Sequence, residues 1–277
     1  MEAVHPKIEI AVPGLGELGA VHIYRHAGEG LRPFVLAIHG GGWFAGDQSS
    51  VAFLWPRLRG LDVALVLPSY RKAPANPFPA AYDDLLRVCE WIKRSGAEHG
   101  LDPDRGMLWG SSAGSHLAML LATRGIAENA GLPKFHGVAT YCGIMNLLTQ
   151  YEFESAHGRK MAADFLGTTP GEDPELYRLA SPELHIHERM PAVWMSHGSG
   201  DVTVPVSQSR QMVSALCRAG YDPIYLEARN LCHTQTEVDE EGNYSDEGLF
   251  QHDLLRFIKR SLGAERFTGV APGTQRS

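Results

Sequence analysis

A serine set between two glycines is the strongest chemical signal in the sequence. The stretch Gly110-Ser111-Ser112-Ala113-Gly114 follows the apolar run 107–109 and opens a helix-like stretch at His116. So sharp a turn between strand and helix forces its central residue into strained backbone geometry, so small residues must stand two positions before and after it. Ser112 is therefore the candidate nucleophile. The helix behind it would direct its positive end at an anion formed there.

A run of three glycines forms the second signal. His39-Gly40-Gly41-Gly42-Trp43 directly follows the apolar run 34–38. Consecutive glycines carry a high conformational-entropy cost, which indicates a place where backbone must approach another group closely. Their N–H groups could hold the oxyanion of a tetrahedral intermediate. A phosphate-binding loop would need a following Lys-Ser/Thr or G-x-G-x-x-G spacing, neither of which is present, and a tight structural turn stays the plain alternative.

A serine nucleophile requires a base, and the base requires an orienting acid. In strand–turn–helix sites of this kind the chain order is Ser, then Asp or Glu, then His. Asp201 follows the strand-like run 192–197, and His233 follows the run 224–227. Both therefore lie in loops beyond strand ends, where open α/β sheets bind their ligands. Among the 13 histidines His233 is the preferred base, with a solvent-facing loop histidine as the alternative.

The elements that must position these residues alternate between short β-rich runs and helix-period segments. This alternation predicts an α/β fold with a mostly parallel central sheet of about eight strands and helices on both faces. The first two strands precede any helical pattern, so we expect them to form an antiparallel edge. Helical periods are expected at 81–92, 212–217 and 250–262. The expected strands are 7–12, 20–26, 34–38, 63–67, 106–109, 137–142, 192–197 and 223–228.

One domain covering residues 1–277 is the better interpretation, because no internal repeat or low-complexity linker divides the chain. The long connection 143–191 breaks the strand–helix alternation, and long connections of this kind are often binding lids. We therefore predict a small lid or cap insertion there, with packing on the surface as the alternative. Its apolar candidates are Tyr151, Phe153 and Phe165. The polar stretch 263–277 is expected to be a flexible tail.

Composition excludes several classes of function. The formal net charge is −7 and no run of Lys or Arg is present, which argues against nucleic-acid binding. No apolar stretch approaches the roughly 20 residues of a transmembrane helix. Residues 1–6 have neither a basic region nor an apolar core, so no signal peptide is expected there. Cys89, Cys142, Cys217 and Cys232 show no CxxC pairing and fall mostly in apolar segments. We therefore expect buried free thiols and a cytoplasmic location.

Taken together, these motifs resemble those of α/β-hydrolases of the esterase/lipase kind. The sequence is similar to the bacterial feruloyl-esterase-like and hormone-sensitive-lipase branches, from about residue 30 to the end of the last helix. The resemblance is carried by 39–47, 70–74, 78–84, 100–105, 110–114, 201–205 and His233. It implies the α/β-hydrolase fold. The absence of a long stretch before residue 39 implies a reduced lid, and Thr234 stands where that family often has glycine.

Carried over position by position, the resemblance assigns roles to individual residues. Ser112 would be the nucleophile, Asp201 the acid and His233 the base of a catalytic triad. The oxyanion hole would comprise the N–H groups of Gly41, Gly42 and Ala113. Trp43 and Met145 are candidates for lining the acyl pocket, although packing in the core or at the rim explains them equally well.

No cofactor and no metal are expected. His185 and His187 could form a pair of metal ligands, but no Cys/His cluster completes a site.

The expected function is hydrolysis of small, short-acyl carboxylic esters through an acyl-enzyme. An arylformamidase-type amide hydrolase with the same triad is the alternative enzyme, and a catalytically inactive small-molecule-binding α/β-hydrolase is the alternative from another class. A small-molecule ester is the expected partner, with no nucleic acid and no membrane. Whether the chain forms a homodimer is left open.

Overall fold

The structure is a computed structural model, and it describes residues 7–15, 20–153, 156–233 and 250–264. Its centre is an eight-stranded sheet in the order β1-β2-β4-β3-β5-β6-β7-β8. β1 pairs with β2 and β2 with β4 in antiparallel fashion, whereas β3 to β8 are parallel to one another. The expected fold class and the antiparallel edge are therefore confirmed. The strands are β1 Ile8–Ala11, β2 Ala20–Tyr24, β3 Arg32–Ile38, β4 Ala64–Leu67, β5 Leu101–Ser111, β6 Phe135–Tyr141, β7 Ala192–Gly198 and β8 Ile224–Ala228.

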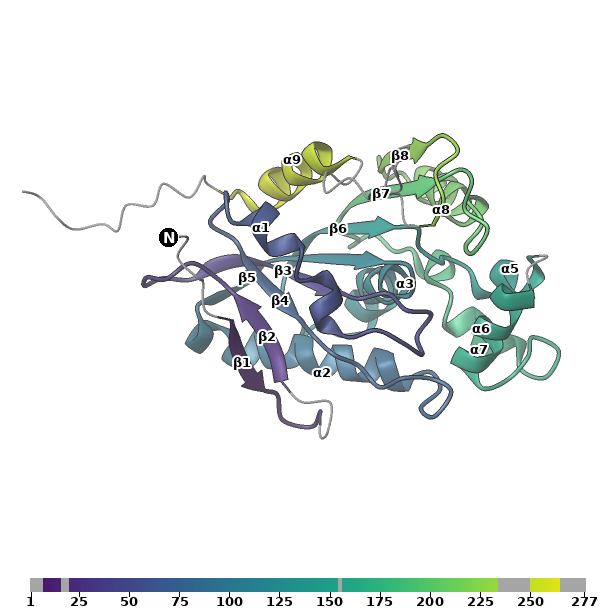
Figure 1. The fold of residues 1–277 in the computed structure, drawn as a ribbon, viewed down its shortest axis with the longest axis horizontal. Helices are drawn as coiled ribbons and strands as arrows, with labels where there is room; N and C mark the ends of the chain where they lie inside the picture. The colour runs from purple at the N-terminus through teal and green to yellow at the C-terminus, as the bar shows by residue number, and fades with distance from the viewer. Residues whose placement is uncertain (1–6, 16–19, 154–155, 234–249, 265–277) are drawn as a thin grey trace, which may run out of the picture.

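Helices cover both faces of this sheet (Figure 1). Alternation along β3 shows how: Phe34, Leu36 and Ile38 pack into one buried cluster and Val35 and Ala37 into the other. The first cluster includes side chains of α2, α3 and α8, and the second includes those of α1 and α9. The helices are α1 Leu54–Leu58, α2 Ala80–Ser95, α3 Ala113–Leu120, α4 Ile126–Glu128, α5 Leu147–Glu152, α6 Ala156–Leu166, α7 Pro174–Leu179, α8 Ser207–Arg218 and α9 Gln251–Leu262.

β5 is longer than the sequence pattern predicts. The expected strand begins at 106, whereas the observed one begins at Leu101, which pairs with Arg32 across an irregularity in the register. The sequence pattern misses residues 101–105 of this strand, because the polar residues Asp102 and Asp104 are typical of a turn. Pairing with the neighbouring strand overrides that local preference.

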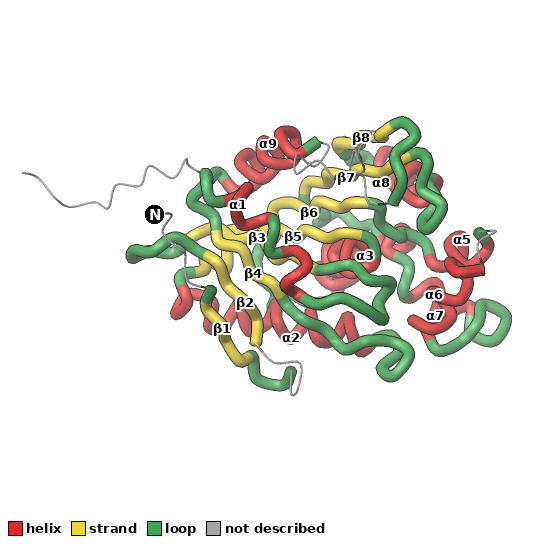
Figure 2. The backbone as a smooth tube through the Cα atoms, viewed as in Figure 1, coloured by secondary structure: helices red, strands yellow, loops and turns green. Residues whose placement is uncertain are grey.

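The segment 143–191 carries α5, α6 and α7 at the edge where the parallel strands end (Figure 2). Two hydrogen bonds hold its start, because the backbone N–H groups of Met145 and Asn146 both donate to Gln208 Oε1 at 2.8 Å. Phe165 is buried within the main core cluster. The segment is therefore packed onto the sheet domain, and its action as a lid stays a prediction. The tail expected at 263–277 lies almost wholly outside the described residues.

Two further expectations concern membranes and thiols. Among the described residues, none of the helices combines the length and the apolar character needed to cross a bilayer. Cys89 and Cys142 are buried as expected, but Cys217 and Cys232 are exposed. The expectation of buried thiols was wrong for the latter two. Cys217 is the second-last residue of the amphipathic helix α8. The buried face of this helix is formed by residues such as Met212 and Leu216, and Cys217 lies outside that face.

Candidate active site

Ser112 lies at the turn between β5 and α3, in a conformation that only the surrounding backbone can impose. Its φ is 54° and its ψ is −121°, which an L residue rarely adopts. A side chain at Gly110 would collide with the carbonyl of Gly114, and one at Gly114 would collide with the carbonyl of Ile38. The Ser112 N–H donates to the Tyr141 carbonyl at 2.8 Å. The two glycines of the motif thus leave the room in which this turn forms.

The structure brings the three predicted triad residues together. His233 Nε2 lies 2.9 Å from Ser112 Oγ, and His233 Nδ1 lies 2.6 Å from Asp201 Oδ2. Asp201 stands in the loop after β7 and His233 in the loop after β8, and these strands are parallel neighbours. The carboxylate is fully buried, whereas the imidazole keeps 25% of its surface exposed. The arrangement allows a proton to pass from the serine hydroxyl to an imidazole that a carboxylate orients.

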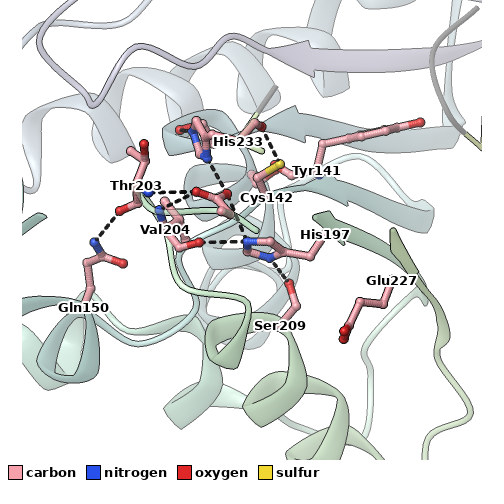
Figure 3. A network of polar contacts seen from close by, with 12 residues as sticks. Tyr141, Cys142, Gln150, His197, Thr203, Val204, Ser209, Glu227 and His233 are labelled. Carbon is pink, nitrogen blue, oxygen red and sulfur yellow. Dashed lines mark hydrogen bonds and ion pairs between the residues drawn. The ribbon is translucent and has the colours of Figure 1, made fainter. Parts of the chain in front are cut away.

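Hydrogen-bond donors surround the Asp201 carboxylate. The residues that supply them, His197, Thr203, Val204 and His233, are labelled in Figure 3. Its Oδ1 accepts from the backbone N–H groups of Thr203 and Val204, both at 2.9 Å. Its Oδ2 lies 3.2 Å from His197 Nε2, in addition to the contact with His233. Burial raises the pKa of the Asp201 carboxyl, but the hydrogen bonds from His197 and His233 outweigh that effect, so the pKa lies well below its usual range. Asp201 is therefore ionised.

His197 is a residue of this network that the sequence did not single out. It is fully buried, and its Nε2 lies 3.0 Å from the Val204 carbonyl as well as close to Asp201. Both of those neighbours only accept, so Nε2 carries a proton, and Nδ1 lies 2.7 Å from the Ser209 hydroxyl. The signal that could have revealed it is its position, four residues before Asp201 in the same strand-to-loop turn.

Glu227 is another carboxylate close in sequence to His233, and it lies apart from the network (Figure 3). Its two oxygens bind the Arg210 guanidinium at 2.6 and 2.9 Å, and one of them accepts from the Tyr225 hydroxyl at 2.8 Å. The carboxylate that orients His233 is therefore Asp201.

The glycine loop, residues 39–46, passes beside Ser112. A Cβ added to Gly40 would lie 3.2 Å from Ser112 Cβ. Gly41 and Gly42 have φ values of 112° and 59°, and Ala113 begins the helix behind Ser112. Among the described residues, the backbone N–H groups of these three residues donate to no carbonyl of the chain. Their donors are thus free to bind a ligand oxygen.

Trp43 and Met145, the candidates for lining the acyl pocket, are both more deeply buried than residues that line an open pocket. Trp43 is fully buried, stacks on Phe165 with ring centroids 4.3 Å apart, and donates from Nε1 to His116 Nδ1 at 3.2 Å. Met145 is also fully buried. Both side chains belong to the main buried core cluster, which favours the packing interpretation, and contact with a substrate stays a prediction. His116 Nε2 donates to the Ala180 carbonyl at 2.7 Å, so this histidine connects the glycine loop with segment 143–191.

Three groups at the site could in principle act as metal ligands. Ligand atoms of Cys142, Asp201 and His233 lie within 4.8 Å of one another. The carboxylate and the imidazole already bind each other, and the Cys142 thiol donates to the His233 carbonyl at 2.8 Å. Within the part of the chain that the structure describes, His185 and His187 belong to no such group, and their Nε2 atoms contact separate backbone carbonyls, those of Leu179 and Ala122.

Comparison with curated proteins finds esterases. Esterase LipQ of Mycobacterium tuberculosis (strain ATCC 25618 / H37Rv) is 29% identical over 211 residues, which cover 73% of this chain and 50% of LipQ. A probable isoprenylcysteine alpha-carbonyl methylesterase of Arabidopsis thaliana, ICMEL2, is 24% identical over 267 residues, which cover 90% of this chain and 62% of the relative. The chain thus spans about half to three fifths of the length of these relatives.

Solved structures share the fold. An esterase of Pyrobaculum calidifontis superimposes with a TM-score of 0.76 at 20% identity, covering 92% of this chain and 86% of the other. A truncated carbohydrate esterase from gut microbiota gives a TM-score of 0.76 at 17% identity, covering 93% of this chain and 96% of the other. Both likenesses confirm the α/β-hydrolase fold. The profile of the BD-FAE family matches residues 21–216, which is most of the chain, and the motif-based resemblance is thereby confirmed. This protein belongs to the BD-FAE family.

Proposed function

We propose that the chain is a serine carboxylesterase that hydrolyses small, short-acyl esters. The observation that carries this proposal is the contact of His233 with both Ser112 Oγ at 2.9 Å and Asp201 Oδ2 at 2.6 Å. The names of the curated relatives, which include esterases and methylesterases, support the ester as the bond that is cleaved.

The geometry supports the following proposed reaction. His233 Nε2 takes the hydroxyl proton as Ser112 Oγ attacks the carbonyl carbon, and the N–H groups of Gly41, Gly42 and Ala113 bind the resulting oxyanion. His233 then gives the proton to the departing alcohol, which leaves an acyl group on Ser112. Water, deprotonated by the same imidazole, attacks the acyl-enzyme and releases the acid. Asp201, held ionised, stabilises the imidazolium in both halves of the reaction.

A substitution of the nucleophile tests the mechanism. Ser112→Ala should lower kcat by about 10⁶ while leaving the fold intact, because removal of a triad serine abolishes acyl-enzyme formation. The matched control is Ser111→Ala, which removes the neighbouring hydroxyl and should stay within a few-fold of the parent. Labelling by a fluorophosphonate, read by mass spectrometry, should modify the parent and Ser111→Ala but not Ser112→Ala. Full activity of Ser112→Ala would refute the proposal.

The preference for short acyl groups is tested by chain length. Each buried methylene is worth about 0.8 kcal/mol, so an open pocket would give rising kcat/KM along an acyl series. Packing of Trp43, Phe165 and Met145 in the main buried core cluster supports the opposite trend, since overpacking costs about 1–3 kcal/mol. We expect an optimum between acetyl and butyryl in nitrophenyl esters, moving to longer chains in Met145→Ala. An optimum at long chains in the parent would contradict the short-acyl proposal. Faster turnover of formyl anilides would instead support the amide hydrolase.

A further inference from the structure

Lys72 contacts His39, the first residue of the glycine loop. Its Nζ is 2.9 Å from His39 Nε2, donates to the Tyr70 carbonyl at 2.9 Å and lies 3.6 Å from the centroid of the Tyr70 ring. The three contacts hold the half-buried ammonium in one place. None of these groups belongs to the Ser112, His233 and Asp201 triad.

The ammonium determines which nitrogen of His39 carries the proton. A charged lysine has three donors and no acceptor, so His39 Nε2 must accept. Burial, and after it the charge of Lys72, lowers the pKa of His39 to about 4, so the ring is neutral and has a single N–H. That N–H is therefore on Nδ1, where it donates to the Gly40 carbonyl at 2.6 Å.

The Gly40 carbonyl belongs to the same peptide plane as the N–H of Gly41. In a planar trans peptide these two groups point in opposite directions, so a hydrogen bond that holds the carbonyl also aims the N–H. The preceding carbonyl, that of His39, accepts from the Tyr70 hydroxyl at 3.0 Å. A Cβ added to Gly46 would lie 2.9 Å from the Gly40 oxygen, so the backbone of the loop closes tightly over this bond.

We propose that Lys72 is a positioning residue of the oxyanion hole, because it fixes the tautomer of His39 and thereby the direction of the Gly41 N–H. This inference rests on the proposed function, in which the Gly41 N–H binds the oxyanion. Lys72 touches no reacting atom and acts through His39.

The segment that carries Lys72 is itself anchored on both sides. Arg71 forms a bidentate pair with the buried Asp84, with two N···O distances of 2.9 Å. The Ala73 N–H donates to the Trp43 carbonyl at 3.1 Å, which ties this segment to the far side of the glycine loop. A change at Lys72 should therefore alter the His39 contact without displacing the backbone.

The charge of Lys72 makes this positioning depend on pH. His39, Tyr70, Asp47 and Asp84 are the titratable groups whose contacts or charges act on it. Burial lowers the pKa of Lys72 to about 8, and Asp47 and Asp84 oppose that effect. Above this pH the neutral amine can also accept a hydrogen bond, so the other His39 tautomer becomes available and the Gly40 carbonyl loses its donor. Turnover should fall as the pH rises through about 8.

The test compares Lys72→Met and Lys72→Arg with the control Lys93→Met, which removes a partly exposed lysine paired with Asp104. Loss of an oxyanion donor costs about 10²–10³ in kcat, and a misdirected donor should cost part of that, about 10-fold. We expect Lys72→Met to lower kcat about 10-fold with KM within twofold. Rates are expressed per active site titrated with a fluorophosphonate, so that a smaller fraction of folded protein does not lower the measured kcat.

The pH profile separates positioning from a merely structural role. The parent should lose kcat above about pH 8, Lys72→Arg should keep the parent's kcat and shift the fall to higher pH, and Lys72→Met should show a low, flat profile. An unchanged kcat per active site in Lys72→Met, or the same alkaline fall in all three proteins, would overturn the inference. Ser112→Ala distinguishes a failure of this inference from a failure of the proposed esterase function. If it is inactive while Lys72→Met is normal, only this inference fails, whereas an active Ser112→Ala removes the proposed function itself.

Discussion

Two loops flank Ser112 and are held in different ways. In the acid loop, residues 197–204, Asp201 binds three partners within four residues, His197, Thr203 and Val204, in addition to the distant base His233. The glycine loop, residues 39–46, is also held by side chains that come from far along the chain. Tyr70 binds the His39 carbonyl, Lys72 binds the His39 ring, and His116 binds Trp43.

This difference follows from what each loop has to hold. A buried carboxylate needs several donors, and neighbouring backbone N–H groups supply them at short range. The glycine loop instead has to leave the N–H groups of Gly41 and Gly42 unused. Within the loop, the N–H groups of Phe44 and Ala45 donate to the Gly41 carbonyl at 3.1 and 2.9 Å, and side chains from other elements supply further contacts. The side chains that hold the glycine loop from a distance therefore lie outside its own sequence motif.

The largest expected effect lies in the acid loop. Asp201→Asn should lower kcat by about 10⁴, because the amide no longer orients and stabilises the His233 imidazolium. The control is Glu227→Gln, which breaks the exposed ion pair with Arg210 and should leave kcat within twofold. Steady-state kinetics on a nitrophenyl ester measure both. Greater damage from Glu227→Gln than from Asp201→Asn would show that the acid has been misassigned.

A smaller effect is expected from the second histidine of the acid loop. His197→Phe removes a hydrogen bond to the ionised Asp201, worth about 1.5–3 kcal/mol, so kcat should fall about 10–100-fold. Ser209→Ala, which removes only the partner of His197 Nδ1, should cost less than His197→Phe in the same assay. If His197→Phe retains the parent's kcat, the backbone donors of Thr203 and Val204 alone are enough to hold the carboxylate.

The smallest effect concerns stability on the glycine-loop side. Burial lowers the pKa of His116 to about 4, so between pH 6.5 and 4 the unfolded chain binds the proton and the folded chain does not. The free energy of unfolding should therefore fall as the pH drops through this window, by about 3 kcal/mol from His116. His116→Phe should be less stable than the parent at pH 7.5 by about 1–3 kcal/mol, because Trp43 Nε1 loses its acceptor. That deficit should shrink on acidification.

Urea unfolding at pH 7.5, 6 and 5 measures this difference. His252→Gln changes an exposed histidine on α9 and serves as the control, with the same pH dependence as the parent. An equally steep loss of stability in His116→Phe would assign the acid sensitivity to other groups, among them His39, whose pKa burial also lowers to about 4.

The sequence alone determined the parts of this protein that depend on short-range patterns. Short β-rich runs between helix-period segments placed all eight strands, and the neighbours of Ser112, Asp201 and His233 marked the side chains that the structure brings together. Such signals are readable because a sharp turn or a strand end restricts the residues within a few positions of itself.

Only the tertiary structure decided which distant side chains support them. The sequence assigned no role to Lys72, His116 or His197, and the structure showed their partners by bringing strands and loops together. Trp43 and Met145 seemed equally suited to a pocket or to the core, and packing against other elements buried both. Hydrogen bonds and burial depend on contacts across the whole chain, and residue type at one position does not specify the other side of such a contact.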